Sequence, residues 1–228
     1  MDRRYAIYWA PEGPLAEFGA SWLGWDAVRG QSAAAPVIAG LPDTREKLIG
    51  AAGRYGFHAT LKAPFVPKPD TAHEDVLAAT EALAARLAPA EVEGGLTLGE
   101  IGGFLALLPV GDTHALDARA AEVTRALEDL RAPLTDAERA RRGAERLTPD
   151  LRENLERWGY PYVMEAFRFH VTLTGNLDRG AAAAVRAALE PHLGPLLPRP
   201  FRLDAICLFG EDPEGRFHLR RRFPLETR

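Results

Sequence analysis

The chain carries the same short histidine motif twice. The segment FHATL at residues 57–61 and the segment FHVTL at residues 169–173 agree at four of five positions. An imidazole has an unperturbed pKa of about 6.5, so it can accept or donate a proton near neutral pH. Two imidazoles on either side of one phosphate group can therefore cleave a phosphoester without a metal ion. One activates a water molecule and the other protonates the departing oxygen.

Both motifs lie in segments with the composition of β-strands, residues 57–65 and 167–174, in which alternate side chains share a face. This alternation predicts a polar face on each strand and a shared cleft between the two. The predicted catalytic residues are His58, Thr60, His170 and Thr172. The residues predicted to hold phosphoryl oxygens from the same faces are Lys62, Arg168 and Thr174.

Further candidate substrate-binding residues precede the two motifs. They are Arg54, Tyr55, Tyr160, Tyr162 and Arg142, the last within a basic cluster with Arg139, Arg141 and Arg146. One interpretation is that the cluster closes over a second phosphate of the substrate and that Tyr160 and Tyr162 stack on a base or sugar ring; the sequence does not decide it. The alternatives are solvated helix charges, tyrosines at strand edges and a simple turn before the first motif.

Residues 4–99 and 103–209 follow the same order: strand, helix, long irregular insert, strand with a histidine, helix, strand. This order predicts an approximate internal duplication. We expect a single bilobal α+β domain over residues 1–228, with a C-terminal hairpin at 201–223. Its two antiparallel sheets should flank a central cleft, with helices on the outside. Other expected elements are a strand at 4–9, a helix at 15–28, either an irregular surface segment or a flap at 30–56, and a helix at 179–193.

The bulk composition excludes several classes of protein. The chain has 228 residues, a formal net charge of −4 and one cysteine, Cys207. These values argue against binding of long nucleic acid, a disulfide framework and a cysteine-rich zinc site. No apolar run is long enough to span a membrane, and prolines interrupt residues 1–18 where a signal peptide would need its apolar core. We expect a cytoplasmic protein with no metal and no cofactor, and no pattern indicates its oligomeric state.

The motifs and their surroundings resemble the two-histidine (2H) phosphoesterase superfamily over the whole chain. The segments RYGFHATLKAPF (54–65) and WGYPYVMEAFRFHVTLTG (158–175) look most like the branch found with phosphonate-utilisation genes. The resemblance implies a bilobal duplicated fold and the four catalytic residues named above. It also implies cyclic or 2′-linked phosphoesters as substrates, among them a phosphorylated ribose cyclic phosphate.

Three functions remain open at this point. The first is metal-independent hydrolysis of a small cyclic phosphodiester, either a cyclic nucleotide or a phosphorylated ribose cyclic phosphate. The second is RNA end processing or 2′-5′ ligation, as in RNA-handling relatives. The third is a catalytically silent module that binds a phosphate ligand. Which histidine is the acid and which the base is not predicted, because the two motifs are nearly identical.

Overall fold

The structure, a computed structural model, describes residues 2–226. Its centre is a seven-stranded sheet with the order β11-β10-β1-β4-β8-β7-β6, and all neighbouring strands are antiparallel. The strands are β1 (Tyr5–Trp9), β4 (Ala59–Phe65), β6 (Leu96–Ile101), β7 (Phe104–Pro109), β8 (Val171–Thr172), β10 (Ala205–Glu211) and β11 (Phe217–Pro224). The predicted α+β class with antiparallel strands is confirmed.

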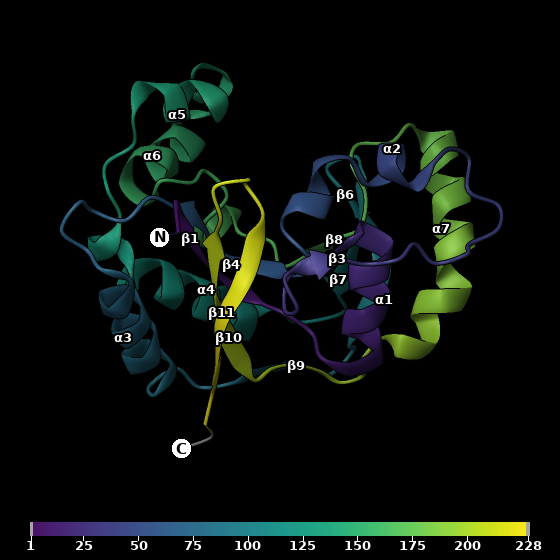
Figure 1. Cartoon of the computed structure of the whole chain (residues 1–228), viewed down its shortest axis with the longest axis horizontal. Helices are drawn as coiled ribbons and strands as arrows, with labels where there is room; N and C mark the ends of the chain where they lie inside the picture. Colours follow the sequence, from purple (N-terminus) through teal and green to yellow (C-terminus); the bar gives the residue numbers. More distant parts are fainter. Residues whose placement is uncertain (1, 227–228) are drawn as a thin grey trace.

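Helices cover the two halves of the sheet separately (Figure 1). The helices are α1 (Gly13–Leu23), α2 (Arg45–Ile49), α3 (His73–Ala84), α4 (His114–Ala126), α5 (Asp136–Arg141), α6 (Pro149–Trp158) and α7 (Arg179–Leu193). Helix α4 contacts β4, α3 contacts β10 and β11, and α7 contacts β6 and β7. Two small sheets, formed by β2 (Trp25–Asp26) with β3 (Gln31–Ser32) and by β5 (Ala90–Val92) with β9 (Phe201–Leu203), complete the fold.

The strand order is symmetric about the line between β4 and β8. Exchanging β1 with β7, β4 with β8 and β6 with β10 reverses the order of these six strands and leaves it otherwise unchanged. Strands β4 and β8 pair through the single register Ala59↔Val171. The two expected sheets are therefore joined into one along this short contact, which brings the ends of both histidine motifs together. The duplication of the sequence itself stays a prediction.

Two predicted elements are shorter than the sequence indicates. The helix expected at 15–28 stops at Leu23, because Gly24 adopts φ +77° and its N–H bonds to the Ala20 carbonyl in a left-handed cap. The strand expected at 167–174 forms a ladder only at β8, after a 3₁₀ turn at Met164–Ala166. At its other end, the amides of Leu173 and Thr174 both donate to the Leu105 carbonyl, which terminates the ladder.

The first strand of the predicted C-terminal hairpin is divided in two. Strand β9 pairs with β5, and β10 alone pairs with β11. The expected hairpin over 201–223 is thus correct for its second part and wrong for residues 201–203. Strand β10 is buried along its whole length, including Cys207, because it lies between β1 and β11 in the interior of the sheet. Within residues 2–226, none of the helices has the length and apolar composition needed to cross a bilayer.

Candidate active site

The two histidine motifs meet at one cavity of about 490 Å³. It lies where β4 approaches β8, and its wall contains all four residues predicted as catalytic: His58, Thr60, His170 and Thr172. Each histidine directly precedes the first residue of its strand, Ala59 in β4 and Val171 in β8. Both rings border the cavity at this junction. The structure thus brings together, from positions more than a hundred residues apart, the side chains that the motif pattern singled out.

Each imidazole is oriented by a backbone carbonyl two residues earlier. The Nδ1 atom of His58 lies 3.0 Å from the Gly56 oxygen, and that of His170 lies 2.7 Å from the Arg168 oxygen. A carbonyl oxygen only accepts hydrogen bonds, so Nδ1 must carry the proton in both rings. The unprotonated nitrogen of each neutral ring is therefore Nε2. In His58 this atom is 3.2 Å from Thr60 Oγ1, whose hydroxyl donates to it.

Burial favours the neutral form of both rings. It lowers the pKa of His58 to about 4, and repulsion from His170 adds to this effect while the Gly56 hydrogen bond opposes it. Burial also lowers the pKa of His170, against the hydrogen bond to Arg168. The two rings are close enough to influence each other's charge. Local environment thus distinguishes two histidines whose sequence motifs are nearly the same.

Tyr8 is a site residue that the sequence did not indicate. Its ring is buried and stacks on His58, with centroids 3.7 Å apart and planes inclined by 22°. Tyr8 lies opposite Thr60 in the register of β1 and β4, so both side chains lie on the cavity side of the sheet. Only the pairing of these two strands reveals this, because nothing in residues 4–9 distinguishes Tyr8 from Tyr5.

Arg4 also lines the cavity and was missed for the same reason. Its guanidinium forms two hydrogen bonds with the Glu211 carboxylate, from Nε to Oε2 and from Nη2 to Oε1, each 2.6 Å long. This bidentate pair raises the pKa of Arg4. Glu211 is the last residue of β10 and Arg4 directly precedes β1, so this ion pair also links two neighbouring strands of the sheet.

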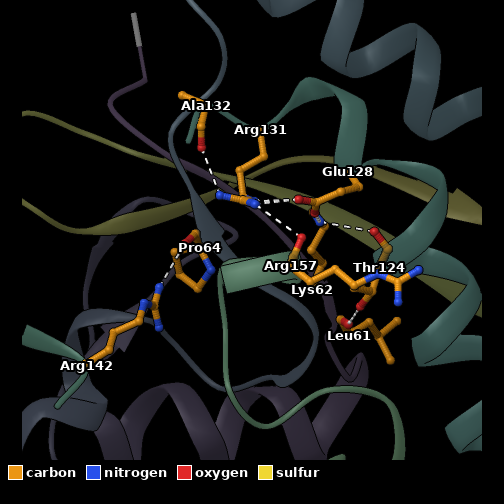
Figure 2. A network of polar contacts seen from close by, with 9 residues as sticks. All are labelled: Leu61, Lys62, Pro64, Thr124, Glu128, Arg131, Ala132, Arg142 and Arg157. Atoms are coloured by element: carbon orange, nitrogen blue, oxygen red, sulfur yellow. Dashed lines mark hydrogen bonds and ion pairs between the residues drawn. The ribbon is translucent and has the colours of Figure 1, made fainter. Parts of the chain in front are cut away.

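The prediction that Lys62 binds phosphate is wrong. Its side chain is 3% exposed, and Nζ bonds to the Glu128 carboxylate at 2.8 Å and to the Thr124 carbonyl at 3.1 Å (Figure 2). The register with β1 changes from Tyr8↔Thr60 to Ile7↔Lys62, so β4 contains one extra residue there. Such a bulge breaks the alternation of side chains. Lys62 therefore leaves the face of Thr60 and points toward the helix layer.

Arg168 and Thr174 were predicted to bind phosphate, but in the structure both side chains form hydrogen bonds with the backbone. Arg168 is exposed, and its Nη1 donates to the Glu165 carbonyl at 2.9 Å; it borders a neighbouring cavity rather than the one with His58. Thr174 lines the main cavity, but its buried hydroxyl oxygen accepts from the Leu105 amide at 2.9 Å. Its role in this structure is to satisfy the backbone where the β8 ladder ends.

Of the two candidate residues before the first motif, one borders the main cavity and the other does not. Tyr55 lines the main cavity and stacks on Phe217, with centroids 5.2 Å apart. Arg54, at the end of a 3₁₀ helix, is exposed and is not among the residues that border this cavity. The expected flap at 30–56 does reach the site, through Ala51, Ala52 and its last residues.

The two tyrosines before the second motif border different cavities. Tyr160 borders both the main cavity and its neighbour, whereas Tyr162 borders only the neighbour and is half exposed. The two rings meet edge to face at 5.8 Å. Burial raises the pKa of Tyr160. Tyr160 is thus one of the residues that lie between the two cavities.

Two arginines of the basic cluster reach the main cavity. Arg141 and Arg142 line it, while Arg139 forms ion pairs with Asp136 and Glu156 on the outside. Helix α5, which carries this segment to the site, begins with a capping box between Thr135 and Glu138. Of the four arginines in the cluster, Arg141 and Arg142 border the main cavity, and Arg139 and Arg146 do not.

The neighbouring cavity has a different character. Its volume is about 600 Å³, and it shares Thr60, Ala63, Tyr160 and His170 with the main cavity. The rest of its wall is mainly apolar and includes Ile101, Phe104, Leu151, Val163 and Phe167. His170 stands at the boundary between a basic space and an apolar one. Among residues 2–226, no three His, Cys, Asp or Glu side chains are grouped so that they could hold a metal ion.

A family model described as "Protein of unknown function (DUF1045)" matches residues 60–218. The chain belongs to this family. The match includes the second histidine motif and begins at Thr60 of the first.

Two curated relatives bear the name "Ribose 1,5-bisphosphate phosphokinase PhnN". The protein from Janthinobacterium sp. (strain Marseille) is 35% identical over 219 residues, which cover 93% of this chain and 48% of the relative. The protein from Laribacter hongkongensis (strain HLHK9) is 36% identical over 217 residues, covering 93% of this chain and 49% of the relative. The chain thus spans about half the length of the curated relatives it matches.

The fold is shared with a crystal structure of a phosphoesterase, at a TM-score of 0.50 and 13% identity over 100% of both chains. Escherichia coli LigT complexed with 3′-AMP aligns with a TM-score of 0.47 and 14% identity, also over 100% of both chains. The first of these alignments shows that the chain has the fold of a structurally characterised phosphoesterase.

Proposed function

We propose that the chain hydrolyses a small cyclic phosphodiester by proton transfer between two histidines, without a metal ion. One observation carries the proposal: His58 and His170 face one cavity, each with Nδ1 bonded to a backbone carbonyl. The reactive Nε2 atoms are therefore fixed in tautomer and orientation before substrate binds. That is the requirement for a base and an acid acting on one phosphate.

The reaction consumes one water molecule and gives a single product, because the substrate ring is opened and no fragment leaves. His58 Nε2 takes a proton from water, whose oxygen forms a new bond to phosphorus. The bond from phosphorus to one ring oxygen breaks, and protonated His170 gives its Nε2 proton to that oxygen. The product is an opened phosphomonoester with a free hydroxyl. Thr60 and Thr172 hydroxyls donate to the non-bridging oxygens, so Thr60 must turn its proton from His58 to the substrate.

The assignment of base and acid follows from the electrostatic surroundings. The pKa of His58 is lowered to about 4 by burial and by His170, so this ring is neutral at the pH of the cell and suits the base. An anionic substrate raises the pKa of both rings. His170, at the boundary with the second cavity, is then the ring that carries a proton to the departing oxygen.

The relatives support a phosphorylated ribose cyclic phosphate as the substrate. Opening a 1,2-cyclic phosphate of ribose 5-phosphate at oxygen 2 yields ribose 1,5-bisphosphate, the compound in the relatives' printed name. The kinase activity in that name is not proposed for this chain, since none of its lysines stands in the G-x₄-G-K-S/T pattern of a P-loop. A place in phosphonate metabolism follows from the sequence resemblance and from this substrate.

A nucleotide substrate is the second candidate. The apolar cavity beside His170, with Phe104, Tyr160 and Phe167 in its wall, has the composition that holds a nucleobase. This observation favours a cyclic nucleotide or the end of an RNA strand as the ligand. A silent binding module would use the same cavities without turnover.

The decisive assay compares substrates in excess EDTA. We expect hydrolysis of ribose 5-phosphate 1,2-cyclic phosphate, with losses of roughly 10²–10⁴ in kcat for His58→Asn and His170→Asn. Nucleoside 2′,3′-cyclic phosphates and an oligonucleotide with a cyclic end serve as competitors. Preference for the oligonucleotide would replace the proposal with RNA end processing. Tight binding without turnover, unchanged by either substitution, would leave only the binding module.

A further inference from the structure

The main cavity is basic and carries no acid. Its charged and polar lining comprises three arginines, three tyrosines, two histidines and three threonines, and no Asp or Glu borders it within the described part of the chain. The residues are Arg4, Arg141, Arg142, Tyr8, Tyr55, Tyr160, His58, His170, Thr60, Thr172 and Thr174. A cavity with this lining is suited to an anion.

The arginines differ in how their charges are compensated. Arg4 has a bidentate partner in Glu211. Arg142 has no ion-pair partner within 4 Å among residues 2–226, and its buried Nε lacks a hydrogen-bond partner. Its Nη2 donates to the Pro64 carbonyl at 3.4 Å, away from the ion-pair network of Lys62, Glu128 and Arg131 (Figure 2).

Burial makes this arrangement costly in the free protein. A guanidinium withdrawn from water without a counter-ion loses hydration that nothing replaces. Burial accordingly lowers the pKa of Arg142, and Arg141 and Arg4 act in the same direction, whereas Tyr160 and Glu138 oppose it. The ring of Tyr160, with the guanidinium carbon 4.9 Å from its centroid, supplies one weak compensation. The guanidinium of Arg142 thus borders the cavity with its positive charge only partly compensated.

The scissile phosphate is bound at a different part of the cavity from this guanidinium. It is bound between the two histidines and their threonines, on β4 and β8, whereas Arg142 enters the cavity from the end of α5 and is anchored at Pro64 near the far end of β4. In the register with β1, the five steps from Thr60 to Phe65 match the three steps from Tyr8 to Tyr5, or about 10 Å at about 3.3 Å per residue. The anchor of Arg142 at Pro64 thus lies at a different point along β4 from the threonine of the first motif.

We infer that Arg142, with Arg141 and Tyr160, forms a second anion subsite that holds a phosphomonoester at the opposite end of the substrate from the cyclic phosphate. The preferred substrate is thus a doubly phosphorylated small molecule. This rests on the proposed function for the place of the cyclic phosphate, but anion binding by Arg142 can be tested without turnover. A planar guanidinium with free donors matches the geometry of a terminal phosphate.

The first experiment measures binding by calorimetry at low salt, with ribose 5-phosphate as the probe. Wild type and three variants are compared: Arg142→Met, Arg142→Lys and the matched control Arg146→Met, an exposed arginine of the same segment that does not border the cavity. We expect Arg142→Met to weaken binding by about tenfold or more, because charge-assisted bonds of a fork are lost. Arg142→Lys should bind with intermediate affinity, and Arg146→Met like wild type.

The second experiment compares ribose 1,2-cyclic phosphate with and without a 5-phosphate as substrates. Wild type should prefer the 5-phosphorylated ester through a lower KM, and Arg142→Met should remove most of that preference. Thermal unfolding without ligand provides a folding control, since Arg142→Met removes an uncompensated charge and should not lower Tm.

The outcomes separate the two claims. Equal affinity of wild type and Arg142→Met for ribose 5-phosphate, or an equal loss in Arg146→Met, overturns the second subsite. A 5-phosphate preference that survives Arg142→Met does the same. Binding that depends on Arg142 without hydrolysis of either ester supports the subsite and overturns only the proposed reaction.

Discussion

The ring of Tyr8 lies flat against the imidazole of His58, with centroids 3.7 Å apart. Tyr8 in turn contacts Phe209 and Phe217 at 4.9 and 6.1 Å between ring centroids, so the histidine rests on an aromatic layer rather than on water. Burial lowers the pKa of His58, and the stacked Tyr8 ring covers one face of the imidazole. The same contact fixes the plane of the ring, which the Gly56 hydrogen bond alone leaves free to tilt.

Removing the Tyr8 ring should raise the pKa of His58 from about 4 toward 6.5, because water then reaches the imidazole. Tyr8→Leu is the informative change and Tyr8→Phe the control that keeps the stack. NMR titration of the His58 resonances measures both. An unchanged titration in Tyr8→Leu would mean that other residues provide the burial. Tyr8→Leu should also be destabilised, by about 2–4 kcal/mol for the cavity left.

Stability should fall in mildly acid solution because of His58. Its folded-state pKa of about 4 lies below the unfolded value of about 6.5, so the unfolded chain binds the proton more readily between these limits. The stabilisation is complete above pH 6.5 and is lost as pH falls toward 4, with a slope of up to about 1.4 kcal/mol per pH unit. Chemical denaturation at several pH values should show a shallower slope for His58→Asn. His192→Asn, at an exposed site, should behave like wild type.

The pH dependence of kcat/KM should be bell-shaped with its maximum on the acid side of neutrality. His58 must be unprotonated to act as base, which places the acid limb near pH 4, and His170 must be protonated, which places the alkaline limb below the usual pKa of about 6.5. Steady-state rates across pH 3.5–9 measure the profile. A flat profile above neutrality would contradict the assignment of His170 as acid.

Lys62 should matter for stability and not for catalysis. Glu128→Ala removes its carboxylate partner and leaves a buried ammonium with only the Thr124 carbonyl, a loss of roughly 3–5 kcal/mol. Lys62→Met should cost much less, because Glu128 keeps its second partner Arg131 at 2.6 Å. Urea denaturation gives both values. A large fall in kcat for Lys62→Met, with the fold intact, would restore the phosphate-binding role that the strand pattern predicted.

Local sequence determined much of this protein. The repeated His-x-Thr pattern was sufficient to identify His58, Thr60, His170 and Thr172, which border the cavity. Residues two apart on an extended segment point to the same side, so the spacing alone places each histidine beside its threonine. Helix α7 lies at the residues expected from its alanine-rich periodicity, and β1 within one residue of its prediction. Both depend on contacts close in the sequence, through helical hydrogen bonds or the propensity of a short aromatic segment.

The tertiary structure decided what neighbours each polar side chain has. Lys62 shares the parity of His58 in the sequence, but a bulge set by pairing with β1 turns it to the other face. Tyr8 and Arg4 enter the site only because β1 lies between β4 and β10. Strand register and burial depend on segments far apart in the chain, so the single sequence contains the residues of the site but not the pairing that sets their exposure, partners and pKa.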